Sequence, residues 1–230
     1  MARPVAETSP APPPAVRAAA LFVLGALVLA LSLMAAAMAL YPGGTWLDRS
    51  SPGHDFLRNF FCDLTADRAI NGQTNPGAAF AKAGMILLSA GTLPFWFLVT
   101  RLFSQRARLA LAVRGLGLAS ALAAIGVPLA PSQRYGLLHA LLIFVAGVPG
   151  LLAGGLATFG LVTTNHGPRT PARLAGLTAG LAALDGALYA AHIASGVEIT
   201  SALLPTLQKL AALALVAWMA GTAALAGLRD

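Results

Sequence analysis

Residues 18–41 read AAALFVLGALVLALSLMAAAMALY, a continuous apolar run without a charged residue. A helix needs about 20 such residues to cross the hydrocarbon core of a bilayer. The small residues at 35–37 imitate a signal-peptide cleavage site, but the run exceeds the roughly 7–15 apolar residues of such a peptide. The run therefore predicts a retained transmembrane helix, and a cleaved signal peptide is the alternative.

Further apolar runs of similar length follow along the chain. Helices are the only open-ended element that can span lipid, because lipid cannot satisfy free backbone groups. The predicted spans are Ala18–Tyr41, Gly77–Thr100, Leu109–Ala130, Gly136–Val162, Ala172–Ala194 and Thr200–Leu228. The sequence thus predicts an all-α fold, an integral membrane bundle of six transmembrane helices over residues 17–230. The Pro- and Ala-rich residues 1–16 predict a disordered cytoplasmic tail.

The composition supports this class of protein. Only 10% of the 230 residues are charged and 57% are hydrophobic, whereas soluble domains carry about 25% charged residues. The net charge of +7 does not indicate a nucleic-acid partner, because the basic residues lie in short loops between apolar runs. The heavy use of Ala and Arg favours a bacterial source.

The arginines also predict the orientation of the helices. Alternate loops carry basic residues without acidic ones: Arg101, Arg106, Arg108, Arg114, Arg169 and Arg173. The opposite loops carry arginines that are offset by acidic residues, among them Asp55 and Asp67. Because basic loops stay in the cytoplasm, we expect a cell-membrane protein with both termini cytoplasmic and residues 42–76 outside.

The long loop between the first two spans contains a patterned segment, His54–Ala66. Its apolar residues recur at helical spacing, which predicts a short amphipathic helix at the outer membrane surface. Within it, Asp63 is either an N-cap or part of a solvated helix face, or it is a ligand-contacting residue or structural anchor that closes the outer mouth of the bundle, where Asn59 is the second residue of the loop motif. Cys62 is the only cysteine, which excludes an intramolecular disulfide and a Cys-based zinc site.

Residues 59–64, NFFCDL, followed by Asn75-Pro76 and a predicted helix, resemble a family motif. The family is the uncharacterised bacterial and archaeal membrane proteins grouped as domain of unknown function 998. Those proteins commonly show an Asn-x-x-Ser-Asp-Leu-Gly pattern after the first helix. The resemblance implies a six-helix fold over roughly residues 18–228 and supplies no activity. Cys62 and Thr65 stand where Ser and Gly are usual, so a hydroxyl-based role at residue 62 is not carried over.

Several ionisable side chains fall inside the predicted spans, where each needs a partner or a wet cavity. Asp185 and Lys209 lie at matching depths on consecutive antiparallel helices, so we predict that they form an ion pair. In the fifth span, Asp185, Tyr189 and His192 share one face at i, i+4 and i+7. The predicted lining of an outward-facing polar cavity is His139, Asp185, Tyr189, His192, Lys209 and Lys82.

We expect the loop carrying Asn59 and Asp63 to cover this cavity. The alternative is that the polar groups only satisfy one another where helices meet. His139, Asp185 and His192 are metal-ligand types, but Asp185 and His192 are two helical turns apart. We therefore predict neither a metal nor a cofactor.

Three functions stay open at this point. The first is a multi-pass membrane protein that binds a membrane lipid or a small amphiphile. The second is an intramembrane hydrolase that uses the outer His/Asp cluster, although the sequence contains no Gly-rich phosphate loop, G-x-S-x-G elbow or HExxH motif. The third is a membrane scaffold or assembly partner. The sequence leaves the activity and the oligomeric state open.

Overall fold

The computed structural model describes residues 12–164, 168–195 and 198–227, and this part of the chain is all-α. The long helices are α1 (Pro14–Leu40), α2 (Ala78–Arg101), α3 (Ala107–Gly126), α4 (Ser132–Val162), α5 (Arg169–Ser195) and α6 (Glu198–Gly227). Two short 3₁₀ helices are η1 (Phe61–Thr65) and η2 (Val127–Leu129). Within these described residues, six helices are long and apolar enough to cross a membrane. The predicted fold class is confirmed, and the chain is a multi-pass membrane protein.

The boundary of the predicted tail needs a correction. Helix α1 begins at Pro14, three positions before the predicted start of the domain, because proline is favourable in the first turn of a helix. Residues 1–11 of the predicted tail lie outside the described residues.

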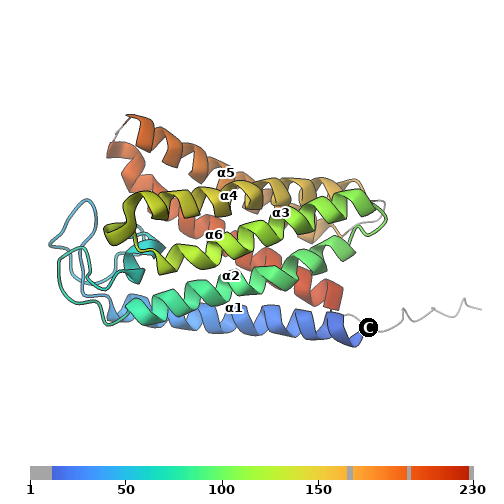
Figure 1. Ribbon diagram of the computed structural model, residues 1–230, viewed down its shortest axis with the longest axis horizontal. Helices are drawn as coiled ribbons and strands as arrows, with labels where there is room; N and C mark the ends of the chain where they lie inside the picture. The colour runs from blue at the N-terminus through green and yellow to red at the C-terminus, as the bar shows by residue number, and fades with distance from the viewer. Residues whose placement is uncertain (1–11, 165–167, 196–197, 228–230) are drawn as a thin grey trace, which may run out of the picture.

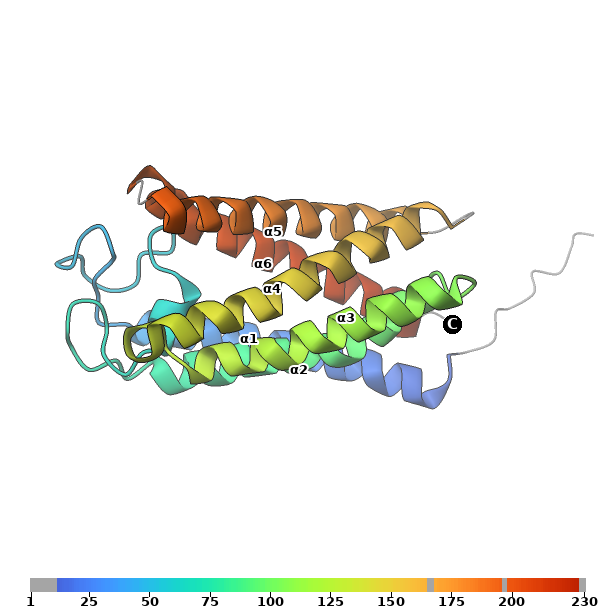
Figure 2. The same ribbon diagram turned by 45° about the horizontal axis from the view of Figure 1, so that its top comes forward.

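The helices form a closed ring in which each packs on its neighbours in sequence and α6 returns to contact α1 and α2. Pro14 and Gly227 lie at one end of the bundle, and residues 41–77 lie at the other (Figure 1). We call the two ends the terminal end and the loop end, and the adjoining parts of the bundle the terminal half and the loop half. Helix α6 crosses obliquely, close to α1 at the terminal end and away from it at the loop end (Figure 2).

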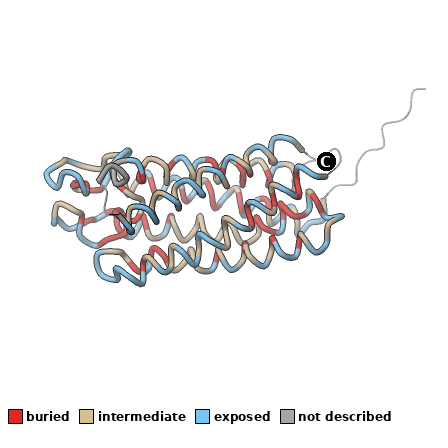
Figure 3. Tube along the Cα trace, turned by 90° about the horizontal axis from the view of Figure 1, so that it is seen from above, coloured by how far each residue is buried: buried red, intermediate tan, exposed pale blue. Residues whose placement is uncertain are grey.

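The terminal half is closely packed. The rings of Phe95, Trp96 and Trp218 meet with centroids 4.8–5.8 Å apart, and all three side chains are buried. A side chain at Gly117 would overlap the Trp96 ring. Glycine is therefore what lets α3 approach α2. Figure 3 shows buried residues gathering in this half and at the base of the loop.

The predicted amphipathic helix over His54–Ala66 is not confirmed. The Asp55 carboxylate instead accepts hydrogen bonds from the N–H groups of Leu57 and Arg58 and closes a turn. Asp63 accepts from the N–H of Phe60, and only the five residues of η1 follow. Such side chain-to-backbone bonds compete with helical ones. The last four residues of η1, 62–65, are buried, so this segment is part of the protein interior.

Candidate functional site

Asn59 and Asp63 hold the loop together from within. The two carboxylate oxygens of Asp63 accept hydrogen bonds from Trp46 Nε1 (3.0 Å), the Phe60 N–H (2.8 Å) and Asn59 Nδ2 (3.4 Å). Asn59 Nδ2 also donates to the Gly44 carbonyl at 2.8 Å. Burial raises the pKa of Asp63 above its usual value, and these donors oppose the shift. Asp63 is therefore a buried residue that caps η1 and joins parts of the loop, which excludes a solvated helix face, and its role at the outer mouth of the bundle stays a prediction.

Side chains of α6 fasten the loop to the bundle. Thr206 Oγ1 donates to the Leu57 carbonyl at 3.0 Å, and Gln208 Oε1 accepts from the Phe61 N–H at 2.9 Å. Lys209 Nζ donates to the Asn59 carbonyl. Loop residues 57–61 are therefore tied to α6 through their backbone. Because the loop contributes only backbone atoms to these bonds, its side chains at positions 57–61 are not needed for the attachment to α6.

The predicted ion pair between Asp185 and Lys209 is wrong. The Lys209 side chain is 1% exposed and turns toward the loop, where it donates to Asn59 and, at 3.1 Å, to the Pro205 carbonyl. Its ammonium also lies 5.3 Å from the ring centroids of both Phe56 and Phe61. Asp185 Oδ1 is buried without a hydrogen-bond partner. The prediction compared only the depths of Asp185 and Lys209 along their helices. It did not consider that the flexible lysine stem can reach carbonyl oxygens and aromatic rings of the loop.

Two further predicted residues make separate contacts at the loop end. His139 is buried, and its Nδ1 lies 2.7 Å from the Ala130 carbonyl at the end of η2. Lys82 pairs with Asp67 at 2.8 Å, and the Asp67 side chain is 82% exposed. His139 thus binds the carbonyl of Ala130 at the end of η2. Lys82 forms a surface ion pair that contributes little to stability.

The remaining predicted residues lie on α5. The Tyr189 ring packs against Phe144 with centroids 6.0 Å apart, and His192 is half-buried. Within the described part of the chain, no group of three or more His, Cys, Asp or Glu could hold a metal ion. Of the six side chains predicted to line one cavity, Lys209 alone lines the pocket that the structure contains at the loop end.

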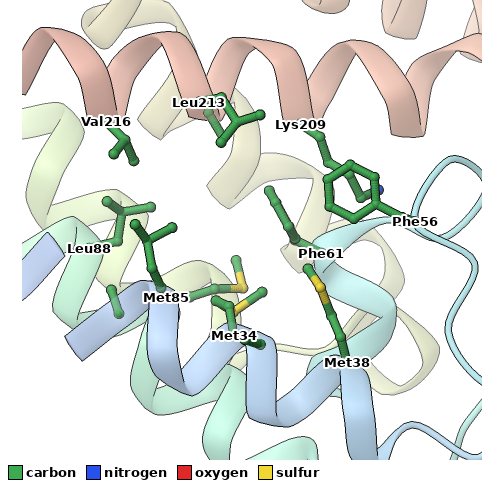
Figure 4. A pocket seen from close by; sticks show the side chains of 13 residues that line it. Met34, Met38, Phe56, Phe61, Met85, Leu88, Lys209, Leu213 and Val216 are labelled. Carbon is green, nitrogen blue, oxygen red and sulfur yellow. The ribbon is translucent and has the colours of Figure 1, made fainter. Parts of the chain in front are cut away.

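This pocket lies beneath the loop, between α1, α2 and α6, with a cavity volume of about 210 Å³ (Figure 4). Its lining is Ala30, Leu31, Met34, Ala35, Met38, Phe56, Phe61, Met85, Leu88, Lys209, Ala212, Leu213 and Val216. Apart from Lys209, every one of these side chains is apolar. Sequence reasoning missed the pocket because it followed polar residues. A usable signal was present, since three of the five methionines in the chain line it.

The pocket opens sideways toward the region that lipid occupies. At the terminal end α6 meets α1, where a side chain at Gly227 would collide with Ala20. Toward the loop end the two helices separate (Figures 1 and 2). Leu31 of α1 is 47% exposed and Leu213 of α6 is 51% exposed, and both belong to the lining. They mark a lateral opening between α1 and α6, with the loop as its roof.

His54, which packs against a ring of the pocket lining, does not supply a second cation. Burial and, after it, the charge of Lys209 lower the pKa of His54 to about 4, so its imidazole is neutral at pH 7. His54 packs edge-on against Tyr41 and Phe56. Lys209 is therefore the cation of the pocket lining.

Comparisons with known proteins give no indication of the function of this pocket. No family model, no curated protein and no solved structure matches the chain. The similarity of residues 59–64 to the motif of domain of unknown function 998 stays a prediction.

Proposed function

We propose that the protein binds the alkyl chain of a membrane lipid or small amphiphile in the pocket between α1, α2 and α6. The observation that carries this proposal is an apolar cavity of about 210 Å³ with a lateral opening to the bilayer. Apolar cavities of this order stay dry and accept apolar guests. The volume is below the roughly 300–1,000 Å³ of pockets for drug-sized ligands, which favours one alkyl chain over a larger ring system.

The chemistry of the lining supports an adaptable binding site. Met34, Met38 and Met85 carry unbranched, polarisable side chains that rearrange around guests of different shape, and methionine is frequent on surfaces that bind varied apolar partners. Phe56 and Phe61 of the loop cover the end of the pocket (Figure 4). An alkyl chain that enters between α1 and α6 would exchange contacts with lipid tails for contacts with these side chains.

We also propose that the loop end faces the outside of the cell and that both termini are cytoplasmic. The arginine distribution supports this orientation, since the short connections at the terminal end carry the unbalanced basic residues. The ligand would then come from the outer leaflet. A scaffold that takes no ligand is the alternative, and the following experiment separates the two.

The test is photocrosslinking with a dodecanol that carries a diazirine on its alkyl chain, on protein in lipid nanodiscs. We expect labelling of α1, α2 and α6 around the pocket. Ala212→Phe fills the pocket and should abolish this labelling, whereas Ala217→Phe places the same side chain on an exposed position of the same helix and should preserve it. Equal labelling of both variants, spread over all lipid-facing helices, would contradict the proposal.

A further inference from the structure

We infer that the pocket prefers an amphiphile with an acidic head group, and that Lys209 determines this preference. The inference rests on the proposed function, because it names the chemical class of ligand for the same pocket. Its basis is the position of the Lys209 ammonium and the way its charge is balanced.

Lys209 lies at the loop end of the pocket, beside the rings that close it (Figure 4). Phe56 and Phe61 both line the cavity, and each ring centroid is 5.3 Å from Lys209 Nζ. The opposite end of the cavity is formed by aliphatic side chains such as Leu88 and Val216. An amphiphile in the pocket would therefore direct its chain toward these residues, and its head would reach the buried Lys209 ammonium by passing between the Phe56 and Phe61 rings.

The charge of Lys209 has no carboxylate in contact with it. An ammonium has three N–H donors, and two of them are accounted for by the carbonyls of Asn59 and Pro205. Among the described residues no carboxylate lies within 4.0 Å of Nζ. Asp63 and Asp55 interact with Lys209 only at longer range, and the oxygens of both carboxylates are occupied by donors of the loop.

A buried cation balanced mainly by neutral carbonyls and rings favours an incoming anion. Charged groups within the membrane are costly and usually paired, and a bond between an ammonium and an acidic oxygen is about twice as strong as a neutral hydrogen bond. A carboxylate or phosphate head would supply the missing negative charge. A protonated amine head would be repelled, and an alcohol oxygen would accept a charge-assisted hydrogen bond from the ammonium without neutralising its charge.

The experiment is competition against the diazirine-bearing dodecanol on the wild-type protein. The competitors are laurate, dodecyl phosphate, dodecanol and dodecylamine, which share a chain and differ in the head. We expect the two acidic compounds to displace the probe at concentrations about tenfold lower than dodecanol, equivalent to about 1.4 kcal/mol, with dodecylamine weakest. The stronger of the two acidic compounds would distinguish a fatty acid from a phosphate-bearing lipid as the source of the ligand.

Two variants of Lys209 test whether its charge causes the preference for acidic head groups. Lys209→Met keeps the apolar stem but removes the charge and the bond to Asn59, so laurate and dodecanol should displace the probe at equal concentrations, whereas Lys209→Arg, which keeps the charge, should retain the preference for acidic heads. Equal displacement by laurate and dodecanol in the wild-type protein would overturn the inference and leave the proposed function standing. Absence of any pocket-specific labelling by the probe would overturn both.

Discussion

The terminal half and the loop half of the bundle are built from the same helices but are stabilised differently. In the terminal half, α2 and α6 meet through Phe95, Trp96 and Trp218, and glycine allows a third helix to approach. In the loop half, α1 and α6 separate, and methionines and the roof of the loop surround an open cavity. Aromatic rings and a glycine at the α2–α3 contact close one half, whereas the separation of α1 and α6 leaves the other half open between flexible side chains.

The two halves should therefore respond to different substitutions. The terminal half depends on van der Waals packing, which in a membrane is the main force between helices. The loop half depends on buried hydrogen bonds that fasten residues 42–76 to one another and to α6. A larger side chain should destabilise the terminal half, and the loss of a hydrogen-bond acceptor should destabilise the loop half.

The largest expected effect concerns the reactivity of Cys62 in the loop half. Burial raises the pKa of its thiol from 9.0 to about 12, and the thiolate is the reactive form, so labelling at pH 7 should be about a thousandfold slower than in the unfolded protein. The measurement is the labelling rate with a membrane-impermeant maleimide before and after denaturation. Similar rates in the two states would show that the loop is open. In intact cells, labelling that requires access from the inside would overturn the proposed orientation.

The next effect is the loss of the Asp63 acceptor. Asp63→Ala leaves the donors of Trp46, Phe60 and Asn59 without their acceptor, and an unsatisfied buried group costs about 1–3 kcal/mol, so we expect the free energy of unfolding to fall by about 3 kcal/mol. The control is Asp67→Ala in the same loop, because the exposed pair with Lys82 contributes only about 0–1 kcal/mol. Thermal unfolding measures both. Equal losses would show that Asp63 is not the anchor of the loop.

Added volume in the terminal half should have a smaller effect. Gly117→Ala forces a methyl group into the Trp96 ring, and overpacking typically costs about 1–3 kcal/mol. Gly115→Ala, two residues earlier on α3, meets nothing within 4 Å and should cause no loss. A lower midpoint of thermal unfolding for the first variant alone is the expected result. Equal midpoints would mean that α2 and α3 are not in close contact here.

The smallest expected effect is that of Asp185→Asn. Because Asp185 makes no ion pair with Lys209 and its Oδ1 has no partner, the change leaves no counterion unpaired and the free energy of unfolding should not fall. A loss of several kcal/mol would instead indicate that a buried ammonium had been left without its counterion. In that case the loop half would be held by the ion pair that the sequence suggested.

Hydropathy was sufficient to predict the six spans, because lipid imposes one length and one backbone pattern on every crossing. The local structure of the loop was not predictable in the same way. The periodicity of Phe56, Phe60 and Phe61 is compatible with a helix, but Asp55 and Asp63 bind nearby backbone groups and end it early. The periodicity of a sequence indicates on which side of a helix its side chains would lie. It does not show whether a polar side chain binds the backbone N–H groups that a helix would use.

The candidate site shows a second limit of sequence reasoning. Depth along a helix correctly placed Lys209 in the loop half but paired it with the wrong group, because a long side chain reaches contacts about a helical turn away from its own Cα. The bonds of Asp63 to nearby backbone N–H groups could be anticipated, because a short acidic side chain commonly caps a helix start or closes a turn. The methionines were visible in the sequence but their arrangement was not, because Met34 of α1, Met85 of α2 and Val216 of α6 come together only through the packing of three helices.

The central claim, an alkyl-binding pocket confined to the loop half, is tested most directly by methyl NMR of the methionines. Met34, Met38 and Met85 line the pocket, whereas Met219 is fully buried in the terminal half and serves as an internal reference. On titration of methyl-labelled protein with dodecanol, the three pocket signals should shift together and saturate, and the Met219 signal should stay in place. Shifts of all four signals in proportion to the added dodecanol, or of none, would contradict the account.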